Sequence, residues 1–157
     1  MDWERVARFA LLGSAHLEPY AILLLRASLG LFFAISGAQK LFVPARRQVM
    51  YETLVEAKVP FPGPMTYFVA GVELVAGCAL IAGFLSTLAC AALLVDMLIA
   101  IVTTKLFAMP RGLSPLSWID DFLYLPEVLY VLCFICLICF GPGKFSVDYW
   151  LADKLLG

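Results

Sequence analysis

Six ionisable side chains fall within, or at the last turn of, stretches of the chain that are otherwise almost entirely apolar. Three are basic and three are acidic: Arg26, Lys40, Glu73, Asp96, Lys105 and Glu127. A charge at the centre of a membrane-spanning helix costs about 2.5 to 3.5 kcal/mol on insertion scales, and such groups pair with one another or mark functional sites. The chemistry open to this set is the binding of a polar or redox-active ligand, or proton transfer with Glu73 and Glu127 as the candidate carriers.

The apolar stretches around these charges predict an all-α integral membrane protein. The chain has 157 residues, 63% hydrophobic and 15% charged, and its mean hydropathy is +0.95. A spanning helix needs about 20 predominantly apolar residues. Four windows meet this condition: 20–43, 65–85, 87–108 and 122–140. We therefore expect a four-transmembrane-helix bundle that forms a single domain over residues 1–157.

The segments outside the spans predict short helices at the membrane surface. Residues 46–57 contain good helix formers and are followed by prolines, so we expect a surface helix in this first long loop. Residues 107–121 are expected to form an ordered cap that lies across the bundle. Interfacial helices are expected at both termini, in the first 20 residues and in the tail, where Ser146 is the expected cap.

One face of the first predicted span carries two charges together with two glycines. Its members recur at steps of four and three residues: Arg26, Gly30, Phe33, Gly37 and Lys40. Small residues also flank the acids of the second and third spans, and in membranes small residues mark helix contacts. The charges are therefore expected to point at other helices and not at lipid.

Depth along the helices predicts which charges pair. Glu73 and Asp96 both lie near the midplane, where Arg26 is expected to reach one of them. The lysine of the first or of the third span is expected to lie near Glu127, toward the opposite surface. Because one arginine can neutralise only one of the two midplane acids, the other acid should be protonated or should bind a ligand. Structural ion pairs and a functional site thus remain alternatives.

The cysteines and the histidine give little support for a metal site. Cys133, Cys136 and Cys139 form a CxxCxxC pattern inside the fourth predicted span, where positions six residues apart are about 120° apart around the helix, so the three thiols are expected to pack as small apolar groups. His16 is the only histidine and lies outside the spans. We expect no metal and no cofactor bound by this chain alone.

Several motifs, taken in order, resemble the DoxX family of small four-helix membrane proteins. They are LLRASLGLFFAISGAQKLF, VPFPGP, GVELVAGCALIAGFLSTLACAALLVDMLIAI, Glu127 and GPGKFSVD, and the likeness runs from Leu24 to Asp148. The matching positions are Arg26, Gly30, Ser36, Gly37, Lys40, Glu73, Gly77, Gly83, Glu127, Gly141, Gly143, Ser146 and Asp148. Asp96 departs from the pattern, since many relatives are expected to have an apolar residue there.

The resemblance implies a bacterial or archaeal membrane protein grouped with oxidoreductase systems. Relatives include a subunit of a thiosulfate:quinone oxidoreductase and a membrane partner of superoxide-detoxifying and sulfur-transfer enzymes. We therefore expect a small subunit of a membrane-bound oxidoreductase or electron-transfer complex, acting as scaffold or anchor, with quinone as the cofactor such a role would imply. The expected location is the inner membrane, with both termini on the cytoplasmic side. Net charge is −1 without a basic block, which argues against nucleic-acid partners.

Two other functions remain open. The chain could be a catalytic subunit that oxidises or reduces a quinone or sulfur compound, with Glu73 or Glu127 moving the proton and Arg26 or Lys40 holding the anionic form. A small transporter or proton channel has less support, because the sequence shows no inverted repeat and no broken helices.

Overall fold

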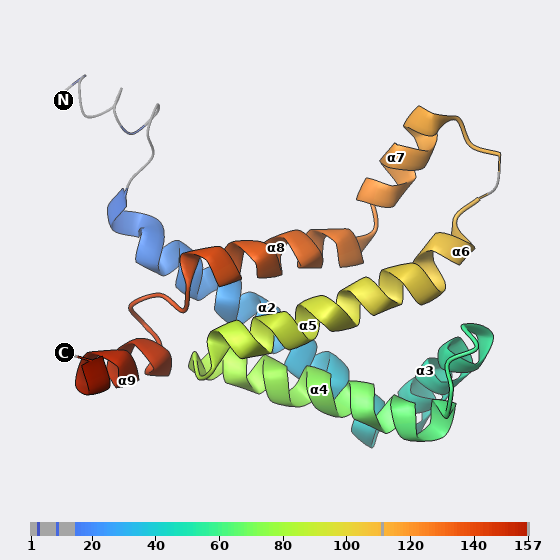
Figure 1. The fold of residues 1–157 in the computed structure, drawn as a ribbon, viewed down its shortest axis with the longest axis horizontal. Helices are drawn as coiled ribbons and strands as arrows, with labels where there is room; N and C mark the ends of the chain where they lie inside the picture. Colours follow the sequence, from blue (N-terminus) through green and yellow to red (C-terminus); the bar gives the residue numbers. More distant parts are fainter. Residues whose placement is uncertain (1–2, 4–8, 10–14, 111, 157) are drawn as a thin grey trace.

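The computed structural model describes residues 3, 9, 15–110 and 112–156, which form helices joined by short connections (Figure 1). A 3-10 turn η1 (Ala15–Leu17) precedes the first long helix. The elements that follow are α2 (Glu18–Phe42), α3 (Pro44–Glu56), α4 (Pro62–Ala82), α5 (Ser86–Ala100), the π-helical turn η2 (Ile101–Lys105), α6 (Leu106–Ala108), α7 (Pro115–Leu123), α8 (Pro126–Phe140) and α9 (Val147–Leu156). The interfacial helix expected at the N-terminus lies mostly outside the described residues.

Three of the expected spans are present as helices long and apolar enough to cross a membrane. They are α2, α4 and the continuous run Ser86–Ala108 that α5, η2 and α6 form together. The second begins at Pro62, earlier than expected, because a proline in the first turn of a helix loses no intrahelical hydrogen bond. The surface helix expected after the first span is α3.

The fourth expected span, 122–140, is wrong as a single straight helix. Helix α8 begins at Pro126 and is bent by 64° from α7. The two helices can form a fourth span only if they cross the membrane together as one broken helix. The cause is Pro126, which disfavours helical backbone at the preceding residue; Leu125 is extended, with φ −66° and ψ 123°. Helix α8 has 15 residues, about 22 Å at the usual rise per residue.

The cap expected across the bundle is also wrong. The segment forms α7, whose N-terminus is capped by the Ser114 hydroxyl accepting from the Ser117 amide. Figure 1 shows α7 projecting away from the other helices instead of lying over them. Its principal contacts are with α8, which follows it in the chain.

The bundle is arranged as a set of adjacent antiparallel contacts. Helix α2 packs most extensively against α4, α5 packs against α8, and α4 and α5 meet through the tight turn between them. The start of α2 and the terminal helix α9 lie at one end of the bundle, with α3 and α6 at the other (Figure 1). The buried core comprises Leu29, Phe33, Ala76, Leu80, Ala89, Cys90, Leu93, Met97, Phe134 and Leu137.

The α2–α4 contact depends on glycines that let the two backbones touch. A Cβ atom added to Gly30 would lie 2.8 Å from the Gly77 carbonyl oxygen, and one added to Gly37 would lie 2.5 Å from the Leu74 amide nitrogen. A Cβ on Gly77 would meet the backbone of Ala34. Because backbone atoms cannot move aside as a flexible side chain can, these positions admit only glycine at this helix separation.

We predict that Gly37→Ala destabilises the protein by about 1 to 3 kcal/mol, because the methyl group forces α2 and α4 apart. The matched control is Gly71→Ala on α4, where an added Cβ would meet no atom within 4 Å. Thermal unfolding of both variants in detergent provides the measurement. Equal midpoints for the two variants would show that the close approach does not determine stability.

Candidate functional site

An ion pair between a half-buried lysine and a buried carboxylate joins α2 to α4 and is the centre of the candidate site. The Lys40 ammonium donates to both carboxylate oxygens of Glu73, at 2.5 and 2.7 Å, and the Ser36 hydroxyl donates to Glu73 Oε2 at 3.2 Å. The Glu73 side chain is 3% exposed and that of Lys40 is 23% exposed. The carboxylate is therefore held by one cation and one hydroxyl in an otherwise apolar helix interface.

The glycine contacts explain why Lys40 is the partner of Glu73. They place Gly30 opposite Gly77, and Gly37 opposite Ala70 and Glu73. Lys40 follows Gly37 by three residues on the same face, and helical side chains tilt toward the N-terminus of their own helix. The long lysine side chain consequently bends back over Gly37 and meets the carboxylate.

A cavity of about 200 Å³ lies between α2 and α3 beside this pair. Ser36 and Lys40 form its α2 wall, and Arg46 and Thr53 belong to its α3 wall. The ion pair is therefore accessible to water or to a small polar ligand from one side. Sequence reasoning did not include Arg46 and Thr53 in the site, although they lie seven residues apart, which puts them on one face of a helix.

Asp96 on α5 is a second acid close to the Lys40–Glu73 pair. Its Oδ2 atom is buried and accepts no hydrogen bond from any residue that the structure describes. The carboxyl group is near enough to Lys40 and Glu73 to interact electrostatically with both. The two midplane acids are thus neighbours, as expected, but the cation near them is Lys40 and not Arg26.

The expected pairing of Arg26 with Glu73 or Asp96 is wrong. Arg26 is 1% exposed, and its Nη1 and Nη2 atoms donate to the carbonyl oxygens of Leu80 at 2.8 Å and of Phe145 at 2.7 Å. The α2–α4 register places Arg26 near Leu80, two helical turns from Glu73. The arginine thereby ties three segments together through backbone acceptors.

The C-terminal family motif completes this connection. The Asp148 carboxylate accepts from the Leu85 and Ser86 amides, both at 2.7 Å, and so caps the start of α5. The Asp148 amide donates to the Gly83 carbonyl oxygen at 2.9 Å. Gly83 has φ 70°, and a Cβ there would overlap the Arg26 guanidinium. This second cluster, which we call the Arg26–Asp148 lock, holds the α4–α5 turn against the segment that leads into α9.

The remaining residues of the motif shape the chain that enters α9. Gly141 and Gly143 have φ values of 78° and 76°, which favour glycine. The Ser146 hydroxyl donates to the Gly143 carbonyl oxygen at 2.7 Å and accepts from the Tyr149 amide at 3.1 Å, so Ser146 is the cap that the sequence predicts. These residues therefore have structural roles far from the Lys40–Glu73 pair.

Lys105 and Glu127 form the second ion pair inside the predicted spans. Of the two lysines expected near Glu127, the one from the third span is its partner. Their nearest atoms are 2.9 Å apart, and the side chains are 40% and 14% exposed. Glu127 Oε2 is buried and has no hydrogen-bond partner among the described residues. The pair joins η2 to the first turn of α8.

The three cysteines of α8 differ in their surroundings. Cys133 is half-buried, whereas Cys136 and Cys139 are exposed on the helix surface. Within residues 15–110 and 112–156, no three His, Cys, Asp or Glu side chains are placed so that they could share one metal ion.

Comparison with known proteins assigns the family. The pattern of the DoxX family matches residues 21–106. This chain belongs to the DoxX family. An uncharacterised membrane protein of Mycobacterium tuberculosis is 30% identical over 139 residues, covering 87% of this chain and 84% of the mycobacterial protein. No solved structure matches the chain. The DoxX protein is thus an all-α integral membrane protein whose matched region contains Lys40, Glu73 and Asp96.

We predict that Glu73→Leu destabilises this DoxX protein by about 3 kcal/mol, the lower end for a broken buried pair, because it leaves the half-buried Lys40 cation without a counter-ion. The double variant Lys40→Met/Glu73→Leu should recover most of that loss, since replacement of both charges by apolar groups of similar volume is close to neutral. Chemical unfolding in detergent measures both. A double variant as unstable as the single one would show that the pair does not couple the two helices.

Proposed function

We propose that this DoxX protein is a small scaffold subunit that anchors a membrane-bound oxidoreductase or electron-transfer complex. The observation that carries the proposal is α7, an amphipathic helix that is bent by 64° from α8 and contacts little besides that helix. A helix of this kind at the edge of a membrane protein offers a surface to a partner subunit.

The apolar side of α7 is exposed along its length. Leu116, Ile119 and Leu123 follow one another at steps of three and four residues and are 79%, 50% and 60% exposed. Trp118 and Phe122 stack on each other with their ring centroids 5.3 Å apart, which gives the helix a rigid aromatic surface beside this stripe. Exposed aromatic and aliphatic groups of this density are typical of interface cores.

The uses of the charged groups support a scaffold as well. Arg26 holds backbone carbonyl groups, and the Lys40–Glu73 and Lys105–Glu127 pairs each join two elements. Charges used in this way fix which helices are neighbours. The electron carriers of the complex would then reside in the partner subunits, and the DoxX protein would place them at the membrane.

We predict that Leu116→Ser/Ile119→Ser lowers the recovery of redox subunits with the DoxX protein by about tenfold or more, because it removes two exposed apolar anchors from one face. Purification in mild detergent followed by mass spectrometry of the co-purifying proteins measures the effect. Leu156→Ser, at an 88% exposed position on α9, is the matched control. Unchanged recovery in both variants would refute α7 as the docking helix, and recovery of no redox subunit with the unmodified chain would refute the scaffold.

A second function is favoured by the unpartnered carboxyl oxygen of Asp96. It lies within electrostatic reach of the half-buried Lys40 and the buried Glu73, and clustered ionisable groups inside a membrane protein are candidates for proton transfer. In this alternative the DoxX protein is a catalytic subunit, and Asp96 or Glu73 carries the proton that accompanies quinone or sulfur-compound reduction.

If the alternative holds, Asp96→Asn reduces quinone-linked electron transfer in membranes by about 10²-fold, because the amide cannot carry the proton, while assembly of the complex is unchanged. Quinone reduction in isolated membranes is the measurement, and Glu52→Gln on the surface helix α3 is the control. Full electron transfer in Asp96→Asn and in Glu73→Gln would leave the scaffold as the function.

A further inference from the structure

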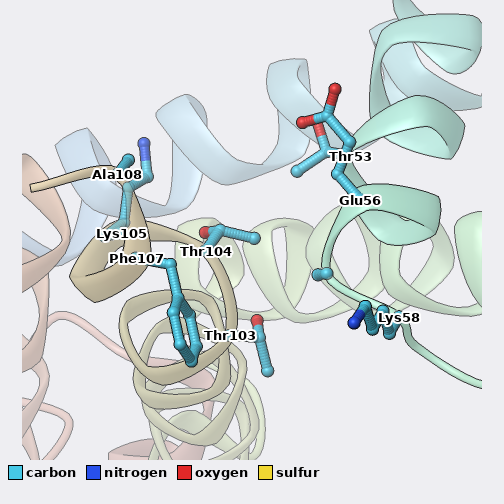
Figure 2. A pocket seen from close by; sticks show the side chains of 9 residues that line it. Thr53, Glu56, Lys58, Thr103, Thr104, Lys105, Phe107 and Ala108 are labelled. Carbon is cyan, nitrogen blue, oxygen red and sulfur yellow. The ribbon is translucent and has the colours of Figure 1, made fainter.

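A second, larger cavity lies where α3 and the end of the third span face one another. Its volume is about 610 Å³, within the range of small-molecule sites. Figure 2 shows Thr53, Glu56 and Lys58 on one side of this space and Thr103 and Thr104 on the other, with the Lys105 amino group turned away toward Glu127. Neither the Lys40–Glu73 pair nor the Arg26–Asp148 lock lines it.

Lys58 occupies a backbone position that normally favours glycine. Helix α3 ends in a turn in which the Lys58 amide donates to the Val55 carbonyl and the Val59 amide donates to the Leu54 carbonyl, both at 3.0 Å. This is the Schellman arrangement, whose left-handed residue is most often glycine. Lys58 adopts this left-handed conformation with φ 55°. The conformation costs free energy for a residue other than glycine, and such strained residues are often found at binding sites. The lysine side chain lines the cavity.

The threonines of the cavity can act there only as hydrogen-bond acceptors. The hydroxyls of Thr53, Thr103 and Thr104 donate to the carbonyl oxygens of Val49, Ile99 and Ala100 in their own helices, at 2.9, 2.7 and 2.6 Å. Each hydroxyl has one hydrogen, so only its oxygen lone pairs remain for a ligand. The π-helical turn η2 places two of these oxygens on the cavity wall.

Two charged side chains also line the cavity: Glu56 adds a hydrogen-bond acceptor with a negative charge, and Lys58 adds a donor with a positive charge. The Glu56 side chain lines the same side of the cavity as Thr53, and Lys58 contributes an ammonium. Neither side chain forms an ion pair with another residue in the part of the chain that the structure describes. The cavity is thus complementary to a group that carries both an anion and several N–H donors.

We propose that this cavity binds a phospholipid head group that carries a phosphate and a primary amine, as in phosphatidylethanolamine. The phosphate faces Lys58, and the ammonium donates to Glu56 and to the threonine oxygens. This site is independent of the function proposed above, because it involves neither α7 nor Asp96.

The position of the cavity favours a lipid over a soluble molecule. It lies at the end of the bundle where α4 begins and α6 ends (Figure 1). Phe107, a lining residue, is 79% exposed, and Arg47 lies 5.4 Å from the Tyr67 ring centroid at the same end. Aromatic and basic residues of this kind mark the membrane interface. A head group here would keep its acyl chains in the bilayer.

The test uses the full chain in mild detergent. The protein is incubated with equal amounts of phosphatidylethanolamine, phosphatidylcholine and phosphatidylglycerol that have the same acyl chains. Native mass spectrometry then identifies the lipid that stays bound. We expect about tenfold preference for the ethanolamine lipid over the choline lipid, because a quaternary ammonium has no N–H to donate. Equal retention of the ethanolamine and choline lipids would overturn the proposal, and so would preferred retention of the glycerol lipid. Displacement by an equal concentration of soluble O-phosphoethanolamine would overturn the lipid as the occupant.

Two variants assign the preference to this cavity. Lys58→Gly should lower retention of the ethanolamine lipid about tenfold while folding as well as the unmodified chain, because glycine favours the positive φ. Glu56→Gln leaves the backbone at position 58 unchanged and should reduce the preference over the choline lipid. Lys144→Gly removes an exposed lysine near α9 and is the control. Retention of the ethanolamine lipid at the unmodified level by both cavity variants would overturn the site.

Discussion

The close contact between the backbones of α2 and α4 determines where most of the other groups in this protein lie. Gly30, Gly37 and Gly77 leave no room for a side chain at the crossing, so the two helices can meet in only one register. That register brings Lys40 to Glu73 and places Arg26 beside Leu80, where the C-terminal segment can reach it. The ion pair, the Arg26–Asp148 lock and the small cavity beside Ser36 all follow from one helix contact.

The ionisable groups inside the bundle are stabilised in different ways: Arg26 by backbone carbonyl groups, and Glu73 by an ion pair with Lys40. Arg26 donates to carbonyl oxygens, which cannot be protonated and so give a permanent structural tie. Lys40 and Glu73 neutralise each other between two helices, and the loss of either leaves an uncompensated charge. Asp96 interacts electrostatically with that pair and has a buried oxygen without a hydrogen-bond partner among the described residues. The backbone-bound arginine and the group of carboxylates with Lys40 therefore occupy two different regions of the same bundle, although one face of α2 supplies residues to both.

Much of the fold could be predicted from the sequence because the spans are long, apolar and bounded by turn residues. The ends of α2, the surface helix α3 and the Ser146 cap all follow from local patterns, whereas α4 begins and ends three residues before its expected bounds. The bend before α8 was not predicted because the expected span was drawn from hydropathy alone. Pro126 interrupts the helix, but it does not make the segment more polar. The partner of Arg26 was missed because depth along a helix does not give the register between helices. In the structure Gly30 lies opposite Gly77, but glycine spacing alone also permits other pairs between α2 and α4.

The shortness of α8 has a consequence for the lipid around the protein. At about 22 Å it does not cover the roughly 30 Å hydrocarbon thickness of a typical bilayer, whereas its 25-residue neighbour α2 does. Local thinning of the bilayer along α8, with head groups and water drawn inward toward Glu127, or continuation of the span through α7 accommodates this difference. The DoxX protein thus presents helices of unequal apolar length to the lipid, and the free energy of embedding it depends on bilayer thickness.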